Sequence, residues 1–112
     1  MSSGIASIAT YRPHPGKEDE LLKIVRRHLP TLRAEGFITE MTPLHLQAAD
    51  GSILEIFEWA SAEAKDAAHR SPAVRELWGA MMEVAEMAAL ASLAEAAQPF
   101  SNFRKLELQQ QH

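Results

Sequence analysis

The 112-residue sequence contains no cysteine, which excludes disulfide bonds, thiolate metal sites and cysteine nucleophiles. It also lacks long basic runs, because no cluster of Lys and Arg is longer than the pair Arg26-Arg27. Fifteen acids against eleven Lys and Arg give a formal net charge of −4. Nucleic acids and anionic membranes are recognised through basic surfaces, so this balance argues against both as partners.

Signals of targeting and of cofactor binding are missing too. Residues 1–4 lack the basic and apolar regions of a signal peptide, so we expect a cytoplasmic protein. The longest apolar tract, residues 79–97, contains Glu83, Glu86 and Glu95 and is too polar to span a bilayer. There is no glycine-rich nucleotide loop, no nucleophile elbow and no histidine spacing typical of metal ligands. The sequence therefore predicts neither a cofactor nor a metal.

What the chain does contain is enough apolar sequence for one core. Hydrophobic residues make up 46% of its 112 positions, and this length suits a single domain. We place that domain at residues 1–108 and expect residues 109–112 to be a frayed tail.

Residue patterns predict six elements in the order strand, helix, strand, strand, helix, strand. Turn residues and helix caps set their limits, and Pro30 is expected to kink the first helix. The predicted strands are residues 5–11, 39–47, 53–59 and 100–108. The predicted helices run from residue 18 to the stop at Gly36, and in two segments from 62 to 69 and from 72 to about 97.

The two middle strands form a predicted hairpin, because the Asp50-Gly51 pair between them suits the positive φ angles of a tight turn. With two or four residues in the turn, even positions of the first strand share a face with odd positions of the second. One face then carries Glu40, Thr42, Leu44, Leu46, Ile53, Glu55, Phe57 and Trp59. The other carries Met41, Pro43, His45, Gln47, Leu54, Ile56 and Glu58. Both faces of the hairpin are therefore apolar in part.

This element order closes most simply as an α+β, ferredoxin-like βαββαβ fold, with a four-stranded antiparallel sheet and both helices on one face. The other sheet face would then be bare. Leaving about four large side chains in water there forgoes roughly 6–12 kcal/mol, comparable with the stability of a whole domain. We therefore expect a homodimer in which two sheets meet face to face in a shared, barrel-like core.

Two stretches of sequence carry a family resemblance. One is residues 11–17, Tyr-Arg-Pro-His-Pro-Gly-Lys, before an acidic helix start; the other is residues 53–61 followed by Ala-Ala-His-Arg-Ser-Pro at 67–72. With them the chain resembles, from about Ile5 to Leu108, the antibiotic biosynthesis monooxygenase (ABM)-like domains of the dimeric α+β barrel superfamily. The resemblance implies the fold and the dimer.

For the reaction, the resemblance implies a set of activities: cofactor-free oxygenation of polycyclic phenols, haem degradation, isomerisation and dehalogenation. Haem degradation fits poorly. In haem-degrading members a helical histidine works with a tryptophan and an asparagine. Here His69 and Trp78 stand in the opposite order, and residues 5–11 contain no asparagine.

Cofactor-free oxygenation needs a base and hydrogen-bond donors beside an apolar cavity. We take His69, His45 and Glu58 as candidate catalytic residues. His69 lies at the break between two helical segments, where the alternative is a hydrogen bond to a backbone carbonyl. In the predicted register His45 faces Glu58, and such a pair is either an acid–base unit or a structural couple in the barrel wall.

Four apolar or aromatic residues are candidates for substrate binding: Tyr11, Trp59, Trp78 and Met81. Aromatic and methionine side chains at helical spacing are also ordinary core residues. The remaining candidates receive structural interpretations. Glu40 and Glu55 are expected at the rim or in salt bridges, His28 as a packing residue on the flank of its helix, and His14 in solvent.

The function expected from these observations is cofactor-independent monooxygenation of a small aromatic or polyketide-like substrate in an apolar cavity between sheet and helices. Two alternatives stay open. One is a non-catalytic small-molecule-binding or stress-related dimer, and the other is an isomerase or decarboxylase of small phenolic or keto acids.

Overall fold

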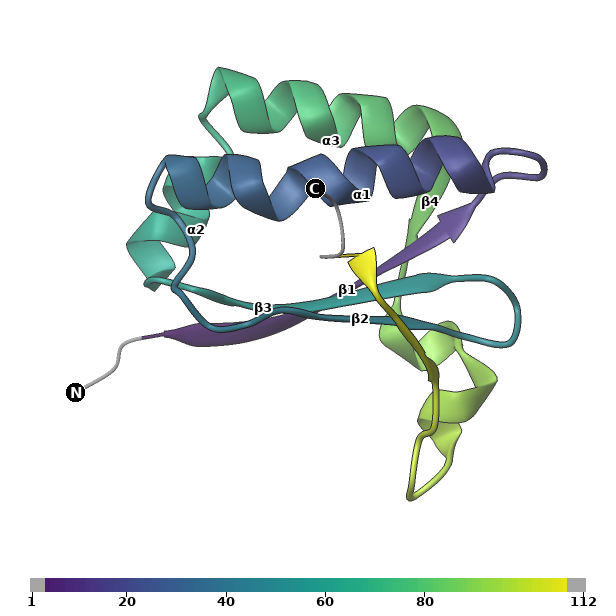
Figure 1. Cartoon of the computed structure of the whole chain (residues 1–112). Coiled ribbons are helices and arrows are strands. Elements are labelled where there is room, and N and C mark those ends of the chain that lie inside the picture. Colours follow the sequence, from purple (N-terminus) through teal and green to yellow (C-terminus); the bar gives the residue numbers. More distant parts are fainter. Residues whose placement is uncertain (1–3, 109–112) are drawn as a thin grey trace.

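An antiparallel sheet with helices on one face forms the protein, as a computed structural model shows for residues 4–108 (Figure 1). The predicted tail, residues 109–112, lies outside the described residues. The five strands run in the order β4-β1-β3-β2-β5 across the sheet. The strands are β1 (Ile5–Pro13), β2 (Leu44–Gln47), β3 (Ile53–Trp59), β4 (Ala85–Ala88) and β5 (Arg104–Leu106). The helices are α1 (Glu18–Ala34), α2 (Ala62–Ala68), α3 (Pro72–Val84) and the short 3₁₀ helices η1 (Leu90–Ser92) and η2 (Ala94–Ala97).

Helix α1 follows from the sequence pattern. Its first turn holds three acids, which the partial positive charge of a helix N-terminus favours. Leu21, Val25, Leu29 and Leu32 recur on one side and are buried against the sheet and α3, and Gly36 ends the helix region with a φ of 78°. Within residues 4–108, none of the helices has the length and apolar character needed to cross a membrane.

The ferredoxin-like fold is confirmed, with five strands in place of the four predicted. Strands β4, β1, β3 and β2, with α1 and α3, form the expected motif. Its fourth strand, however, is Ala85–Ala88, inside the segment predicted to stay helical to about Ala97. The free edge of β1 pairs with this segment, and Arg12 forms an ion pair with Glu86 across it. This tertiary pairing overrides the high helix propensity of alanine.

The predicted final strand forms only at residues 104–106, as β5, and it takes a different place. It pairs with β2 at the opposite edge of the sheet from β4. It is therefore an addition to the ferredoxin-like motif, and its first predicted residues, 100–103, lie outside the strand.

The hairpin register predicted from the sequence is wrong. Its turn contains three residues, 49–51, because the backbone N–H of Ala48 donates to Ser52 O at 2.9 Å, and Gly51 follows with a φ of 93°. An odd turn length pairs even positions with even positions, so His45 lies opposite Glu55 and Leu44 opposite Ile56.

The segment between β4 and β5, residues 89–103, covers part of the sheet face that α1 and α3 leave open (Figure 1). We call it the C-terminal segment. Leu93, between η1 and η2, packs on Leu54 of β3, and both side chains are buried. The rest of this face stays in solvent: Ile8 is 48% exposed and Leu44 is 37% exposed. The open face is thus neither fully covered nor polar.

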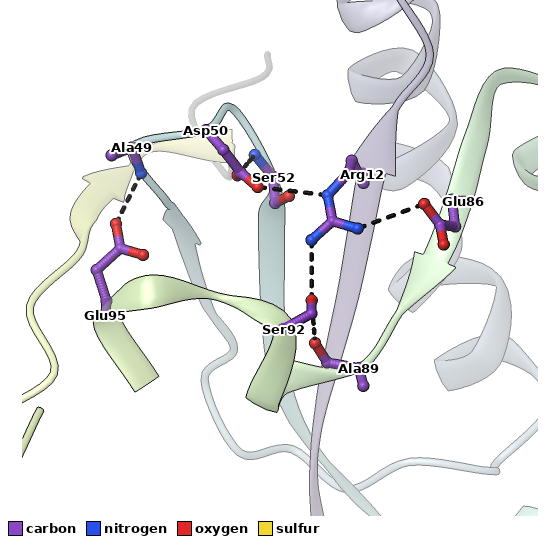
Figure 2. Close-up of polar contacts among 8 residues, drawn as sticks. All are labelled: Arg12, Ala49, Asp50, Ser52, Glu86, Ala89, Ser92 and Glu95. Carbon is purple, nitrogen blue, oxygen red and sulfur yellow. Dashed lines mark hydrogen bonds and ion pairs between the residues drawn. The ribbon is translucent and has the colours of Figure 1, made fainter. Parts of the chain in front are cut away.

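Arg12 fixes the C-terminal segment to the hairpin turn (Figure 2). Its guanidinium lies 3.3 Å from Asp50 and 3.3 Å from Glu86, and it donates to Ser92 Oγ at 2.8 Å. The backbone N–H of Ser52, assisted by Arg12, holds the pKa of Asp50 below its usual value. This group of contacts joins β1, β4, the hairpin turn and η1.

Candidate functional site

A carboxylate lies in the centre of the domain between sheet and helices. Glu55, on β3, has no solvent exposure. Tyr11 Oη on β1 donates to its Oε1 at 2.7 Å, and His28 Nδ1 on α1 lies 2.7 Å from the same oxygen. His45 Nε2 on β2 lies 2.9 Å from Oε2. Three elements therefore supply donors to one buried acid.

The tautomer of His28 follows from its second contact. Trp78 Nε1 on α3 lies 2.8 Å from His28 Nε2. An indole nitrogen only donates, so Nε2 must present its lone pair and the ring proton must be on Nδ1. His28 is thus a neutral imidazole that accepts from Trp78 and donates to Glu55. The three side chains form a directed chain of hydrogen bonds.

The donors keep Glu55 ionised. Burial alone would raise its pKa, but the hydrogen bonds from His28 and His45 outweigh burial and bring the pKa from 4.5 to about 2. Burial, and then the negative charge of Glu55, raise the pKa of Tyr11 well above 10.0. At neutral pH the centre therefore contains a carboxylate that accepts from an intact phenol.

Next to this centre lies an apolar cavity of about 290 Å³, which we call the aromatic cavity. Its exposed wall is apolar, because the polar atoms of Tyr11, His28 and Trp78 are turned into the buried hydrogen bonds. Met82 and Met87 are 57% and 43% exposed and lie where the wall meets solvent. The lining residues are Ala9, Tyr11, His28, Phe57, Trp59, Trp78, Met82 and Met87.

The His28–Glu55 pair has the geometry of an oriented general base. A carboxylate on the Nδ1 side fixes the ring and stabilises the imidazolium that forms when Nε2 takes a proton. In the structure Nε2 accepts from Trp78. A phenol in the aromatic cavity that reached Nε2 would take the place of the indole N–H and present an acidic proton instead.

Three of the four predicted substrate-binding residues line the aromatic cavity: Tyr11, Trp59 and Trp78. The fourth, Met81, does not. Its side chain has no solvent exposure and packs in the core with Leu21 and Val25, while the next residue, Met82, lines the cavity.

The predicted catalytic residues are dispersed. His45 joins the buried centre, but the expected His45–Glu58 pair is wrong, because the three-residue turn puts Glu58 on the opposite sheet face. Glu58 there accepts a hydrogen bond from Thr39 Oγ1 at 2.8 Å. His69 is exposed, and its Nδ1 donates to Lys65 O at 3.0 Å, the backbone contact foreseen as the alternative. Its ring packs edge-on against Trp78.

Sequence reasoning missed the two residues at the centre of this arrangement. Glu55 was expected at the rim, and His28 was expected to be a packing residue. A signal for His28 was present, since it lies on the apolar stripe of α1 between Val25 and Leu32, and a buried polar side chain there requires a partner. For Glu55, pairing with His45 could be predicted only by knowing that the hairpin turn contains three residues.

Comparison with protein families matches residues 4–78 to the family described as antibiotic biosynthesis monooxygenase. The chain belongs to this family. The matched range covers more than half of the sequence and includes Tyr11, His28, His45, Glu55 and Trp78. Neither the comparison with curated proteins nor the comparison with solved structures found a match. Among residues 4–108, no three His, Cys, Asp or Glu side chains are grouped so as to hold a metal ion.

Proposed function

We propose that this ABM-family protein is a cofactor-independent monooxygenase of small aromatic or polyketide-like phenols bound in the aromatic cavity. One observation carries the proposal: His28 lines the cavity, and its Nδ1 donates to the buried Glu55 carboxylate at 2.7 Å. The apolar wall suits an aromatic ring, and the family assignment supports this reaction class.

In the proposed reaction His28 Nε2 takes a proton from the phenol or anthrone, and Glu55 stabilises the imidazolium that results. The deprotonated substrate then passes electrons to dioxygen, and a carbon–oxygen bond forms. Loss of water from the hydroperoxide leaves a carbonyl on the ring. One oxygen atom stays in the product and the other leaves as water, so the substrate itself is the reductant and no other is needed. Tyr11 and His45 are positioning residues that hold Glu55.

Oxygen uptake with anthrone tests this proposal. We expect wild-type protein to consume oxygen and to place one ¹⁸O atom from ¹⁸O₂ in the quinone product. The His28→Gln variant should lose about 10²–10⁴-fold in kcat, as expected for removal of a general base. His14→Gln is the matched control, because this exposed histidine does not line the cavity, and it should keep wild-type activity.

Circular dichroism must first show that both variants fold. Equal activity of the folded His28 variant and wild type would contradict the assignment of the base. Quenching of tryptophan fluorescence by anthraquinone without any oxygen uptake with anthrone would instead favour a non-catalytic binding protein, the alternative predicted from the sequence.

We also infer that the protein forms a homodimer through the open sheet face. The C-terminal segment leaves Ile8, Leu44 and part of Ile56 uncovered there, and ABM-family proteins are usually dimeric. A second copy related by a twofold axis, the commonest symmetry of closed assemblies, buries these side chains. Light scattering at micromolar concentration should give twice the chain mass, and Ile8→Glu should shift it toward one chain mass. A wild-type monomer would overturn the inference.

A further inference from the structure

We propose a second ligand site, for a small organic carboxylate, in a cavity on the other side of helix α1. This cavity has a volume of about 250 Å³ and lies between α1 and β2, whereas the aromatic cavity lies between α1, α3 and strands β1, β3 and β4. We call it the arginine cavity. Its lining residues are Val25, Arg26, Leu29, Pro30, Arg33, Pro43, His45 and Leu108.

The charge of the arginine cavity calls for an anion. Arg26 and Arg33 lie seven residues apart on α1, about two turns, so both guanidinium groups reach the same side of the helix. In the described part of the chain neither side chain forms an ion pair, and no acidic residue is among those that line the cavity. The positive charge on this side of α1 therefore has no counterion from the described residues of the wall.

A buried donor without a partner makes the same point independently. Within residues 4–108, Arg33 Nε is shielded from solvent and has no hydrogen-bond acceptor. Leaving a buried donor unpaired costs about 1–3 kcal/mol, more when it is charged, so such groups are rare in folded proteins. A carboxylate in the cavity supplies the missing acceptor, and the fork of an arginine guanidinium matches a carboxylate in shape.

The rest of the wall indicates what the carboxylate is attached to. Val25, Leu29, Pro43 and Leu108 are apolar, and they would face a hydrated inorganic ion without benefit. A cavity of about 150 Å³ is enough for benzene in a protein interior. The arginine cavity therefore holds a molecule with one ring or a short branched chain and one carboxylate.

His45 places this site beside the buried centre. It lines the arginine cavity, and its Nε2 lies 2.9 Å from Glu55 Oε2, while the other oxygen of Glu55 meets His28. A ligand in the arginine cavity thus changes the surroundings of His45, and the ring resonances of His45 report on binding. The site does not depend on the proposed oxygenase activity.

Calorimetric titration with sodium benzoate at constant ionic strength tests the site. We expect wild-type protein to bind benzoate, and Arg26→Gln and Arg33→Gln to bind at least 10-fold more weakly. Arg27→Gln is the matched control, since it makes the same charge change at an exposed neighbour that does not line the cavity, and it should bind like wild type. In NMR spectra the ring signals of His45 should shift on adding benzoate to wild type and not to Arg33→Gln.

The proposal would be overturned if wild-type protein did not bind benzoate, or if Arg27→Gln and Arg26→Gln lost the same amount of benzoate affinity. It would also be overturned if wild-type protein bound benzyl alcohol or inorganic phosphate as tightly as benzoate. Arg26 is exposed, so its variant tests the site even if Arg33→Gln fails to fold. Oxygen uptake with anthrone, measured on the same variants, shows separately whether the proposed function holds.

Discussion

His28 Nδ1 lies 2.7 Å from Glu55 Oε1, and this contact joins helix α1 to strand β3 in the buried centre of the domain. The carboxylate has no solvent exposure, so its charge is stabilised only by the protein groups around it. The same contact therefore bears on stability and on the proposed chemistry.

We predict that Glu55→Gln destabilises the fold by about 3 kcal/mol, because an amide replaces the charge that three donors surround. Urea unfolding at pH 7 measures this loss. Glu58→Gln is the control: the same change on the same strand affects a side chain that accepts from Thr39 and lies beside Gly4, and it should cost less than about 1 kcal/mol. Similar losses in the two variants would show that the buried centre is no special contributor to stability.

Stability should fall in acid in a window set by Glu55. Its pKa is lowered from 4.5 to about 2 in the folded protein. A carboxyl group with a depressed folded pKa stabilises fully above its unfolded pKa, and this contribution is lost as pH falls through 4.5 toward 2. The amount is on the order of 3 kcal/mol, since one pKa unit corresponds to about 1.4 kcal/mol.

The measurement is urea unfolding at several pH values between 7 and 2 for wild type and for Glu55→Gln. Other carboxyl groups titrate in both proteins, so the difference between their free energies of unfolding isolates the contribution of Glu55. This difference in free energy should become smaller as pH falls. If the two free energies fell in parallel with pH, Glu55 would titrate alike in the folded and unfolded chains.

The tautomer of His28 is testable by nitrogen-15 NMR. The contacts of Trp78 and Glu55 require a neutral ring with the proton on Nδ1 and the lone pair on Nε2. Long-range proton–nitrogen correlations at pH 7 should show this tautomer for His28. In Trp78→Phe the Nε2 resonance should shift, because its donor is gone. A proton found on Nε2 of His28 in wild type would exclude the proposed role as resting base.

Two glycines should respond to alanine in opposite directions. Gly51 has a φ of 93° in the hairpin turn, which costs alanine about 1 kcal/mol, so Gly51→Ala should be destabilising. Gly79 lies inside α3 with open space where a Cβ would be, so Gly79→Ala should stabilise by about 0.5–1 kcal/mol. Thermal unfolding of both variants measures whether each is more or less stable than wild type. A lower melting temperature for Gly79→Ala would refute the prediction for α3.

Local sequence signals predicted the elements that are determined locally. The acids of residues 18–20, the apolar stripe of α1 and the Asp50-Gly51 turn each indicated the element that forms. Strand β4 could not be found this way, because Ala85–Ala88 has a helical composition and becomes a strand only when the edge of β1 pairs with it. The pairing with β1, and not the helix propensity of its residues, determines the conformation of this segment.

The candidate site shows the same division. That His45 pairs with a glutamate was predicted, but its partner depended on the number of residues in one turn. Tyr11, Trp59 and Trp78 were predicted for substrate binding from their residue types, and the structure brings them to one cavity. His28 was placed on its helix correctly, but its partners come from β3 and α3, which no pattern within α1 reveals.

The three-residue turn at 49–51 makes the arrangement sensitive to insertions and deletions at a surface position. Removing one residue there would rotate every side chain of β2 to the other side of the sheet and take His45 out of reach of Glu55. The residues joined by the buried hydrogen bonds would all still be present in the sequence: Tyr11, His28, His45, Glu55 and Trp78. Among relatives of this protein, the length of that loop should therefore indicate a retained or lost centre better than the identities of the residues that form it.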